Sequence, residues 1–225
     1  SHTQKIRHIR GITMLFPKEF YCATKEYSTY EKHIPAPIFR KSFTMETKPE
    51  KAEILISGIG FYDLFINGQK ITKGYLAPYI SNTDDLVYFD HYDLTPYLIH
   101  GENVIGVMLG TGMQNCITAC WNFNDAIFRS SPKFALSFSA VCGDKTVEFG
   151  ADSFLCSESE ITFDNLRSGT HCDARLAQPG WSAPGFNDSG WRNVILADPP
   201  RGQAKLCEAE PIVITAERSP VSIKD

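Results

Sequence analysis

Short apolar runs, each broken by turn-forming residues, follow one another along most of the chain. The clearest run is 134–142, where Phe134, Leu136 and Phe138 alternate with alanine and serine residues. An apolar residue at every second position is typical of a half-buried β-strand, because successive side chains point to opposite faces of a sheet. The same reasoning predicts further strands at 38–43, 52–57, 61–66, 69–71, 86–92, 103–109 and 145–149.

Helix signals are weak by comparison. No window of 12 residues keeps the 3.6-residue repeat of an amphipathic helix. We expect only single helical turns, at 93–99 and 161–167.

Turn residues specify two hairpins. Asn67-Gly68 stands between two predicted strands, and this dipeptide favours a two-residue hairpin because both central residues need positive φ angles. Gly143-Asp144 is expected to form a second hairpin turn. Many short strands with frequent turns predict an all-β fold, namely a jelly-roll β-sandwich.

The chain divides into three parts. Residues 1–37 lack periodicity and are expected to form an N-terminal arm or a first strand. Residues 38–200 are expected to form the jelly-roll sandwich. From Asp198 onward the sequence becomes rich in proline, and 201–225 is expected to be a C-terminal tether, a linker or exit strand toward a next domain.

Composition excludes two classes of partner. The 225 residues are 43% hydrophobic and 21% charged, which is typical of a folded chain with its own core. The formal net charge is −4 without a long basic run, so we expect no nucleic-acid partner, which would require a patch of Lys and Arg. The longest apolar stretch, 104–109, is too short to cross a bilayer, so no membrane partner is expected.

The seven cysteines are not arranged as a metal site. They form no CxxC pair, and no Cys/His pair follows Cys116 and Cys120 at zinc-finger spacing. We therefore expect reduced or buried thiols.

Motifs for catalysis are missing from the sequence: it has no GxSxG, HExxH, P-loop or GxGxxG after a strand. Asp84-Asp85 is a carboxylate pair, but neighbours on a strand point to opposite faces, so the two act together only on a loop. The pair is expected either to form a turn or to bind a metal ion or a sugar. A catalytic pair is disfavoured, because carboxylates that act together in catalysis usually come from separate elements across a cleft.

A family resemblance rests on several motifs in order. The segment 52–68, AEILISGIGFYDLFING, combines a strand, a Gly-x-Gly bend and an Ile-Asn-Gly hairpin. It resembles the opening signature of the α-L-rhamnosidase N-terminal domain. The resemblance covers roughly residues 38–200 and continues through 76–78, 88–95, 101–110, 167–175, 180–181 and 184–191.

The resemblance implies part of a multidomain inverting glycoside hydrolase whose catalytic acid and base lie in a separate (α/α)6 barrel. This chain is then a non-catalytic accessory domain that packs against and supports the catalytic domain. Its partners are that barrel and further β domains of the same polypeptide, and alone it is expected not to hydrolyse α-L-rhamnosides. The sequence does not determine the compartment; a periplasmic or secreted location is favoured over a cytoplasmic one.

The same resemblance allows an alternative, a calcium-dependent module that binds L-rhamnose or rhamnose-containing glycans. Calcium takes oxygen ligands, and an aromatic ring covers the apolar face of a sugar. The candidate sugar-binding residues are Tyr79, Asp84, Trp121 and Asn122. The candidate calcium ligands are Asp85, Asn124 and Asp125. No other cofactor is expected.

Three departures from the family pattern weaken this alternative. Met113-Gln114 stands where the family has a Trp-Tyr pair, Thr170 replaces a Glu, and Cys172 replaces a Tyr. Because three aromatic rings and one carboxylate are lost, we expect L-rhamnose to bind weakly or not at all.

Other residues are expected to be structural: Asn67, Gly68, Asp173, Arg175, Trp181 and Trp191. Asp173 and Arg175 lie on the same side of an extended segment, because they are two residues apart. The planar guanidinium suits bidentate hydrogen bonds. We therefore expect Arg175 to pair with Asp173 or with backbone carbonyls beneath the Trp181 loop.

Overall fold

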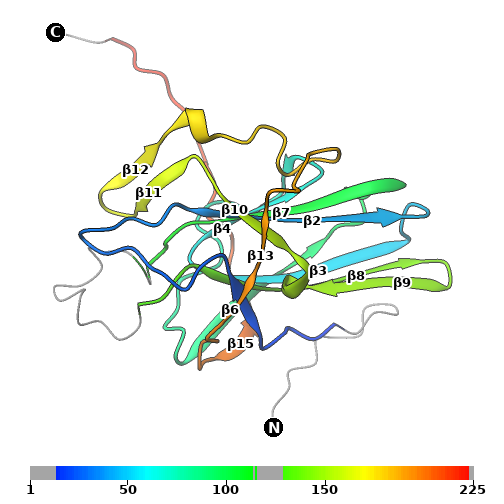
Figure 1. Cartoon of the computed structure of the whole chain (residues 1–225). Coiled ribbons are helices and arrows are strands. Elements are labelled where there is room, and N and C mark those ends of the chain that lie inside the picture. The colour runs from blue at the N-terminus through cyan, green and yellow to red at the C-terminus, as the bar shows by residue number, and fades with distance from the viewer. Residues whose placement is uncertain (1–13, 114, 116–128, 223–225) are drawn as a thin grey trace.

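The computed structural model describes residues 14–113, 115 and 129–222, and these residues form two β-sheets packed face to face (Figure 1). The described part of the chain is almost entirely strands and turns, with two short 3-10 helices, η2 (Ala151–Ser153) and η3 (Ala174–Leu176). The all-β sandwich predicted from the sequence is thus confirmed.

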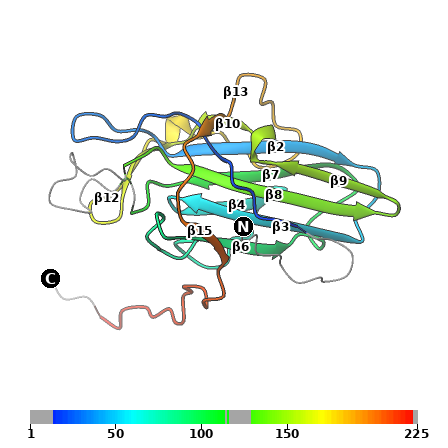
Figure 2. The ribbon, with the colours of Figure 1, turned by 90° about the horizontal axis from the view of Figure 1, so that it is seen from below.

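One sheet has seven strands within the described residues. Its members are β1 (Phe20–Cys22), β3 (Lys51–Ile59), β6 (Leu86–Asp93), β8 (Lys133–Cys142), β9 (Lys145–Gly150), β14 (Ile195–Ala197) and β15 (Gln203–Leu206). They run in the order β14-β1-β8-β3-β6-β15, with β9 paired to β8. The strand β15 lies parallel to β6, and beyond it the tail of the chain runs past the sandwich (Figure 2).

The other sheet has the order β13-β10-β2-β7-β4-β5. Its members are β2 (Pro37–Met45), β4 (Tyr62–Ile66), β5 (Gln69–Lys70), β7 (Gly101–Leu109), β10 (Leu155–Glu158) and β13 (Arg192–Asn193). A separate hairpin of β11 (Ile161–Asn165) and β12 (Gly169–Cys172) projects from one end of the sandwich (Figure 1).

The core lies between the two sheets. Alternate residues of β3 and β8, such as Ile54 and Phe138, are almost fully buried, and so is Val107 of the facing sheet. The rings of Phe39 and Phe134 meet across the sandwich with centroids 4.5 Å apart. Burial of such side chains contributes about 25 cal/mol per Å² of apolar surface, which makes this layer the main source of stability.

Both predicted hairpins are present. Asn67 and Gly68 have φ angles of 51° and 85° and join β4 to β5. Gly143, at φ 58°, lies in the turn from β8 to β9.

One of the two expected helical turns is wrong. Residues 161–165 form β11, because they pair with β12 and bury Phe163 and Asn165 on one side. Pairing with a later segment overrides a weak local preference. At 93–99 the chain does turn, and the Tyr97 amide donates to the Leu94 carbonyl at 3.0 Å.

The arm and the tail each contribute a strand to the sandwich. In the arm, β1 pairs with β8 and β14; in the tail, β15 pairs with β6. The five cysteines in the described part of the chain are all free, and Cys22 and Cys156 are buried.

Candidate functional site

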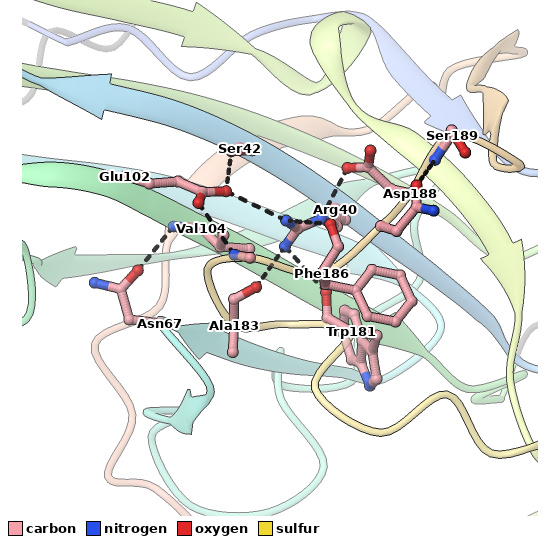
Figure 3. A network of polar contacts seen from close by, with 12 residues as sticks. Arg40, Ser42, Asn67, Glu102, Val104, Trp181, Ala183, Phe186, Asp188 and Ser189 are labelled. Atoms are coloured by element: carbon pink, nitrogen blue, oxygen red, sulfur yellow. Dashed lines mark hydrogen bonds and ion pairs between the residues drawn. The ribbon is translucent and has the colours of Figure 1, made fainter.

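A buried arginine organises the outer face of the second sheet (Figure 3). Arg40 of β2 has a side chain only 1% exposed. Its Nε donates to Asp188 Oδ2 at 2.8 Å, and its Nη1 donates to the carbonyls of Trp181 and Ala183 at 3.2 and 3.0 Å. Its Nη2 reaches the Phe186 carbonyl at 3.5 Å. Glu102 of β7 adds an ion pair, with its Oε1 3.6 Å from Nη2. A guanidinium so buried is stabilised only when it has partners, and here two carboxylates and three carbonyls surround it.

These contacts hold the loop 178–191, which we call the Trp181 loop, against the sheet. Trp181 packs so closely on β7 that a Cβ built at Gly106 would lie 2.8 Å from its ring. The indole N–H of Trp191 donates to Gln178 Oε1 at 3.0 Å. Both tryptophans therefore lie in a loop that the fold itself holds in place.

Arg175 does not lie beneath this loop. Its Nε and Nη2 donate to the two carboxylate oxygens of Asp173 at 2.8 and 2.6 Å, so the expected pair is present. The Arg175 side chain is 88% exposed, however, and its hydrogen bond lowers the pKa of Asp173 at the surface. Arg40 occupies the position under the loop that the sequence suggested for Arg175. Arg40 looked like an ordinary polar position of a strand, because Lys41 and Ser42 follow it in β2.

Asn67 has a second role beyond the hairpin turn. Its Oδ1 accepts from the Val104 amide at 2.8 Å. Its Nδ2 donates to the Tyr97 carbonyl at 3.0 Å and to Asn103 Oδ1 at 2.9 Å. Asn67 thus ties β4 to β7 and to the turn at 95–97, while Gly68 provides the positive φ that the hairpin needs.

Asp84 and Asp85 are occupied by turn and tail contacts. Arg201 Nη2 donates to Asp84 Oδ2 at 2.7 Å, and this hydrogen bond lowers the pKa of Asp84. Asp85 Oδ2 accepts from the side-chain Nδ2 of Asn82 at 2.7 Å. The pair thus holds the turn before β6 and the start of the tail.

The remaining predicted ligands are not brought together by the described residues. Tyr79 is 52% exposed, with its ring edge-on to Tyr88. Trp121, Asn122, Asn124 and Asp125 lie outside the described residues. Among the residues that are described, no three His, Cys, Asp or Glu side chains meet in a way that would hold a metal ion.

A buried cluster that the sequence did not suggest lies where β4 faces β6. The Tyr62 hydroxyl donates to Asp90 Oδ2 and lies 2.9 Å from the Tyr92 hydroxyl. Burial raises the pKa of Asp90 and, together with the neighbouring acidic groups, raises the pKa of Tyr62. Burial also raises the pKa of Tyr92 to about 12. Asp90 looked like an ordinary polar position of a strand, since nothing in its own segment indicates burial.

A second buried carboxyl joins the projecting hairpin to the end of β7. Asp164 Oδ2 accepts from the Thr111 amide at 2.7 Å and from the Thr111 hydroxyl at 3.0 Å. Its Oδ1 is buried and has no hydrogen-bond partner within the described residues. Burial raises the pKa of Asp164, although both contacts from Thr111 oppose that shift.

Two cavities lie on either side of Tyr75 and Leu76. One, of about 220 Å³, includes Asp90 in its lining and is bordered by 207–212 of the tail. The other, of about 350 Å³, includes Asp164 and Leu166. The two carboxyl groups with raised pKa thus line different cavities.

No helix in the described residues has the length and apolar character needed to span a bilayer.

Comparison with known proteins identifies one family. The family model for the alpha-L-rhamnosidase N-terminal domain matches residues 47–216. An alpha-L-rhamnosidase from Formosa agariphila is 29% identical over 179 residues, which cover 74% of this chain and 19% of that protein. One from Streptomyces avermitilis is 25% identical and matches 67% of this chain and 15% of that protein. The chain therefore spans about a fifth of the length of the curated relatives that it matches, or less.

A solved structure shares the fold over most of the chain. The alpha-L-rhamnosidase from Dictyoglumus thermophilum superposes with a TM-score of 0.76 at 29% identity. The match covers 88% of this chain and 23% of that one.

Proposed function

The chain belongs to the α-L-rhamnosidase N-terminal domain family, and we propose that it is a non-catalytic accessory domain that packs against and supports the catalytic part of a longer polypeptide. Support comes from its share of the relatives, since this domain accounts for 19% of the Formosa agariphila protein. In such a protein most of the chain, and therefore other domains, lies outside this sandwich.

The contacts of the charged side chains support a non-catalytic role. Asp84, which suggested chemistry in the sequence, pairs with Arg201 at the tail, and the buried Arg40 holds the Trp181 loop. Inverting hydrolysis needs two carboxyl groups about 6.5–9.5 Å apart across the bond that breaks. Asp90 and Asp164, the two with raised pKa, instead each hold neighbouring elements through Tyr62 and Thr111.

The test compares this chain with the longer polypeptide that contains it. We expect the purified 225-residue chain to show no turnover of an aryl α-L-rhamnoside, and we expect the full polypeptide to lose thermal stability when this domain is deleted. Turnover by the isolated chain that disappears in Asp90→Asn or Asp164→Asn would place an active site here and end the proposal. Asp84→Asn is the matched control, because that carboxylate is exposed and paired.

One observation favours the second candidate, a calcium-dependent module that binds L-rhamnose. Tyr79 stands half exposed and lines two neighbouring cavities, so its ring is available to a sugar face. Calorimetry with L-rhamnose, with calcium and then with a chelator, decides between the two. We expect no calcium-dependent Kd below about 0.1 mM, which corresponds to about −5.5 kcal/mol; tighter binding that Tyr79→Ala abolishes would favour the module.

A further inference from the structure

We propose that the rest of the same polypeptide docks on one surface of this sandwich, which we call the tail-side apolar surface. This inference rests on the accessory role proposed above and adds the place of contact. The surface is defined by apolar side chains that are each at least 42% exposed: Tyr75, Leu76, Tyr79, Ile80, Leu166, Ile212, Val213 and Ile214. Large apolar residues gathered in this way mark a protein contact more often than a solvent face.

The tail is locked onto this surface rather than lying loosely near it. The Tyr75 amide donates to the Ile212 carbonyl at 2.9 Å, and the two residues form a β-bridge. A Cβ at Gly74, whose φ is 75°, would lie 2.3 Å from that carbonyl. Ile212 and Tyr75 thus lie side by side, and the exposed Val213 and Ile214 continue the tail from there.

The shape of the surface suits an interlocking partner. Tyr75 and Leu76 form a ridge, because both residues line the cavity of about 220 Å³ and the cavity of about 350 Å³. Charged groups lie beside the ridge: Lys70 pairs with Asp63 at 2.7 Å, and Glu208 lines the smaller cavity. An apolar centre with polar groups around it is the usual anatomy of a protein interface.

Leu76 adds an observation that the sandwich alone does not explain. Its φ angle is 58°, a left-handed conformation that a bulky side chain rarely adopts. Its side chain is 45% exposed, so burial within this domain does not account for a leucine there. Strained residues of this kind persist mainly at functional contacts, and a partner that covers Leu76 supplies the missing reason.

The partner is the rest of the same polypeptide rather than a second copy. The matched family is one of N-terminal domains, and the chain covers 19% of its Formosa agariphila relative. The remainder of such a protein is connected through the tail, and the tail itself supplies three of the eight apolar residues of the surface. A tethered partner has an effective concentration of roughly millimolar, so a modest surface is sufficient.

The experiment is hydrogen–deuterium exchange on the 225-residue chain and on the full encoded polypeptide, each as wild type, Leu76→Asn and Leu196→Asn. Asn tolerates the left-handed conformation better than Leu, so Leu76→Asn is expected to leave the isolated chain as stable as wild type. Leu196 is the matched control, because it is 54% exposed on β14, at the other end of the sheet order from β15.

We expect amides of 73–77 and 208–214 to exchange at least about tenfold more slowly in the full polypeptide. Leu76→Asn should abolish much of this protection, and Leu196→Asn should not. Protection confined to another face would overturn this inference and leave the accessory role standing, whereas no added protection anywhere would overturn both. If the isolated chain dimerises and Leu76→Asn prevents this, the partner is a second copy, and that result would also overturn the inference.

Discussion

The Trp181 loop and the tail at 207–214 are both irregular segments laid against the sandwich, and the fold holds them in opposite ways. The loop directs three backbone carbonyls and a carboxylate at the buried Arg40. The tail has a backbone bridge at Tyr75 and leaves three consecutive apolar side chains about half exposed. The loop is therefore complete within this chain, while the tail offers surface that another part of a protein can cover.

The largest expected effect comes from breaking the loop's charged centre. Arg40→Met leaves Asp188 and three carbonyls without their shared donor, and removal of one partner from a buried ionic network costs about 3–5 kcal/mol. Urea unfolding followed by tryptophan fluorescence measures this free energy. Arg40→Lys, which keeps the charge but not the planar fork, should fall between wild type and Arg40→Met. A loss below about 1 kcal/mol would mean that the loop is held by packing instead.

A smaller effect is expected where the loop rests on the sheet. Gly106→Ala places a methyl group 2.8 Å from the Trp181 ring and from Ser182 Cβ, and overpacking of this kind costs about 1–3 kcal/mol. Gly190→Ala is the matched control, because a Cβ there meets no atom within 4 Å. Equal unfolding free energies for the two variants would show that the loop moves aside freely.

The pH dependence of stability tests Asp164, which lines the larger of the two cavities beside Tyr75 and Leu76. Its pKa is raised in the folded state, so the folded protein binds the proton more tightly than the unfolded chain. The stability associated with this carboxyl is present below its unfolded pKa and is lost as pH rises through the folded pKa. Asp164→Asn should therefore gain thermal stability relative to wild type between acidic and neutral pH.

Asp84 should show the opposite pH dependence of stability from Asp164. Its pKa is lowered by Arg201, so its contribution is present above the unfolded pKa and is lost as pH falls through the folded pKa. Asp84→Asn should lose stability relative to wild type as pH rises. Melting temperatures of both variants across pH 3–8 check the signs, and a parallel response would contradict these assignments.

The smallest effect is expected at Arg175. The pair with Asp173 is bidentate, but the Arg175 side chain is 88% exposed, and exposed ion pairs contribute little to stability. Arg175→Ala should leave the midpoint of urea unfolding unchanged within error. A loss comparable to that of Arg40→Met would show that the surface pair, and not the buried arginine, secures this part of the molecule.

Local pattern was sufficient for most of the fold. The period-2 alternation at 134–142 and the Asn67-Gly68 turn predicted β8 and the β4–β5 hairpin. Both signals act within a few residues, because side-chain direction along a strand and the φ angles of a tight turn are local properties. The motif order between 52 and 191 likewise indicated the family, which the match over residues 47–216 shows.

Burial and partnership were decided by tertiary structure. Arg40 lies 148 residues from Asp188 in sequence, and Asp164 lies 53 residues from Thr111, so no local pattern distinguishes these groups from surface charges. The same holds for 161–165, which became β11 through pairing with β12. The sequence by itself determined the strands that have a clear local pattern, such as β8, because side-chain alternation and turn residues depend on neighbours along the chain. Only the folded arrangement determined which charges are buried and which apolar side chains remain exposed, because both depend on residues that meet across the sandwich.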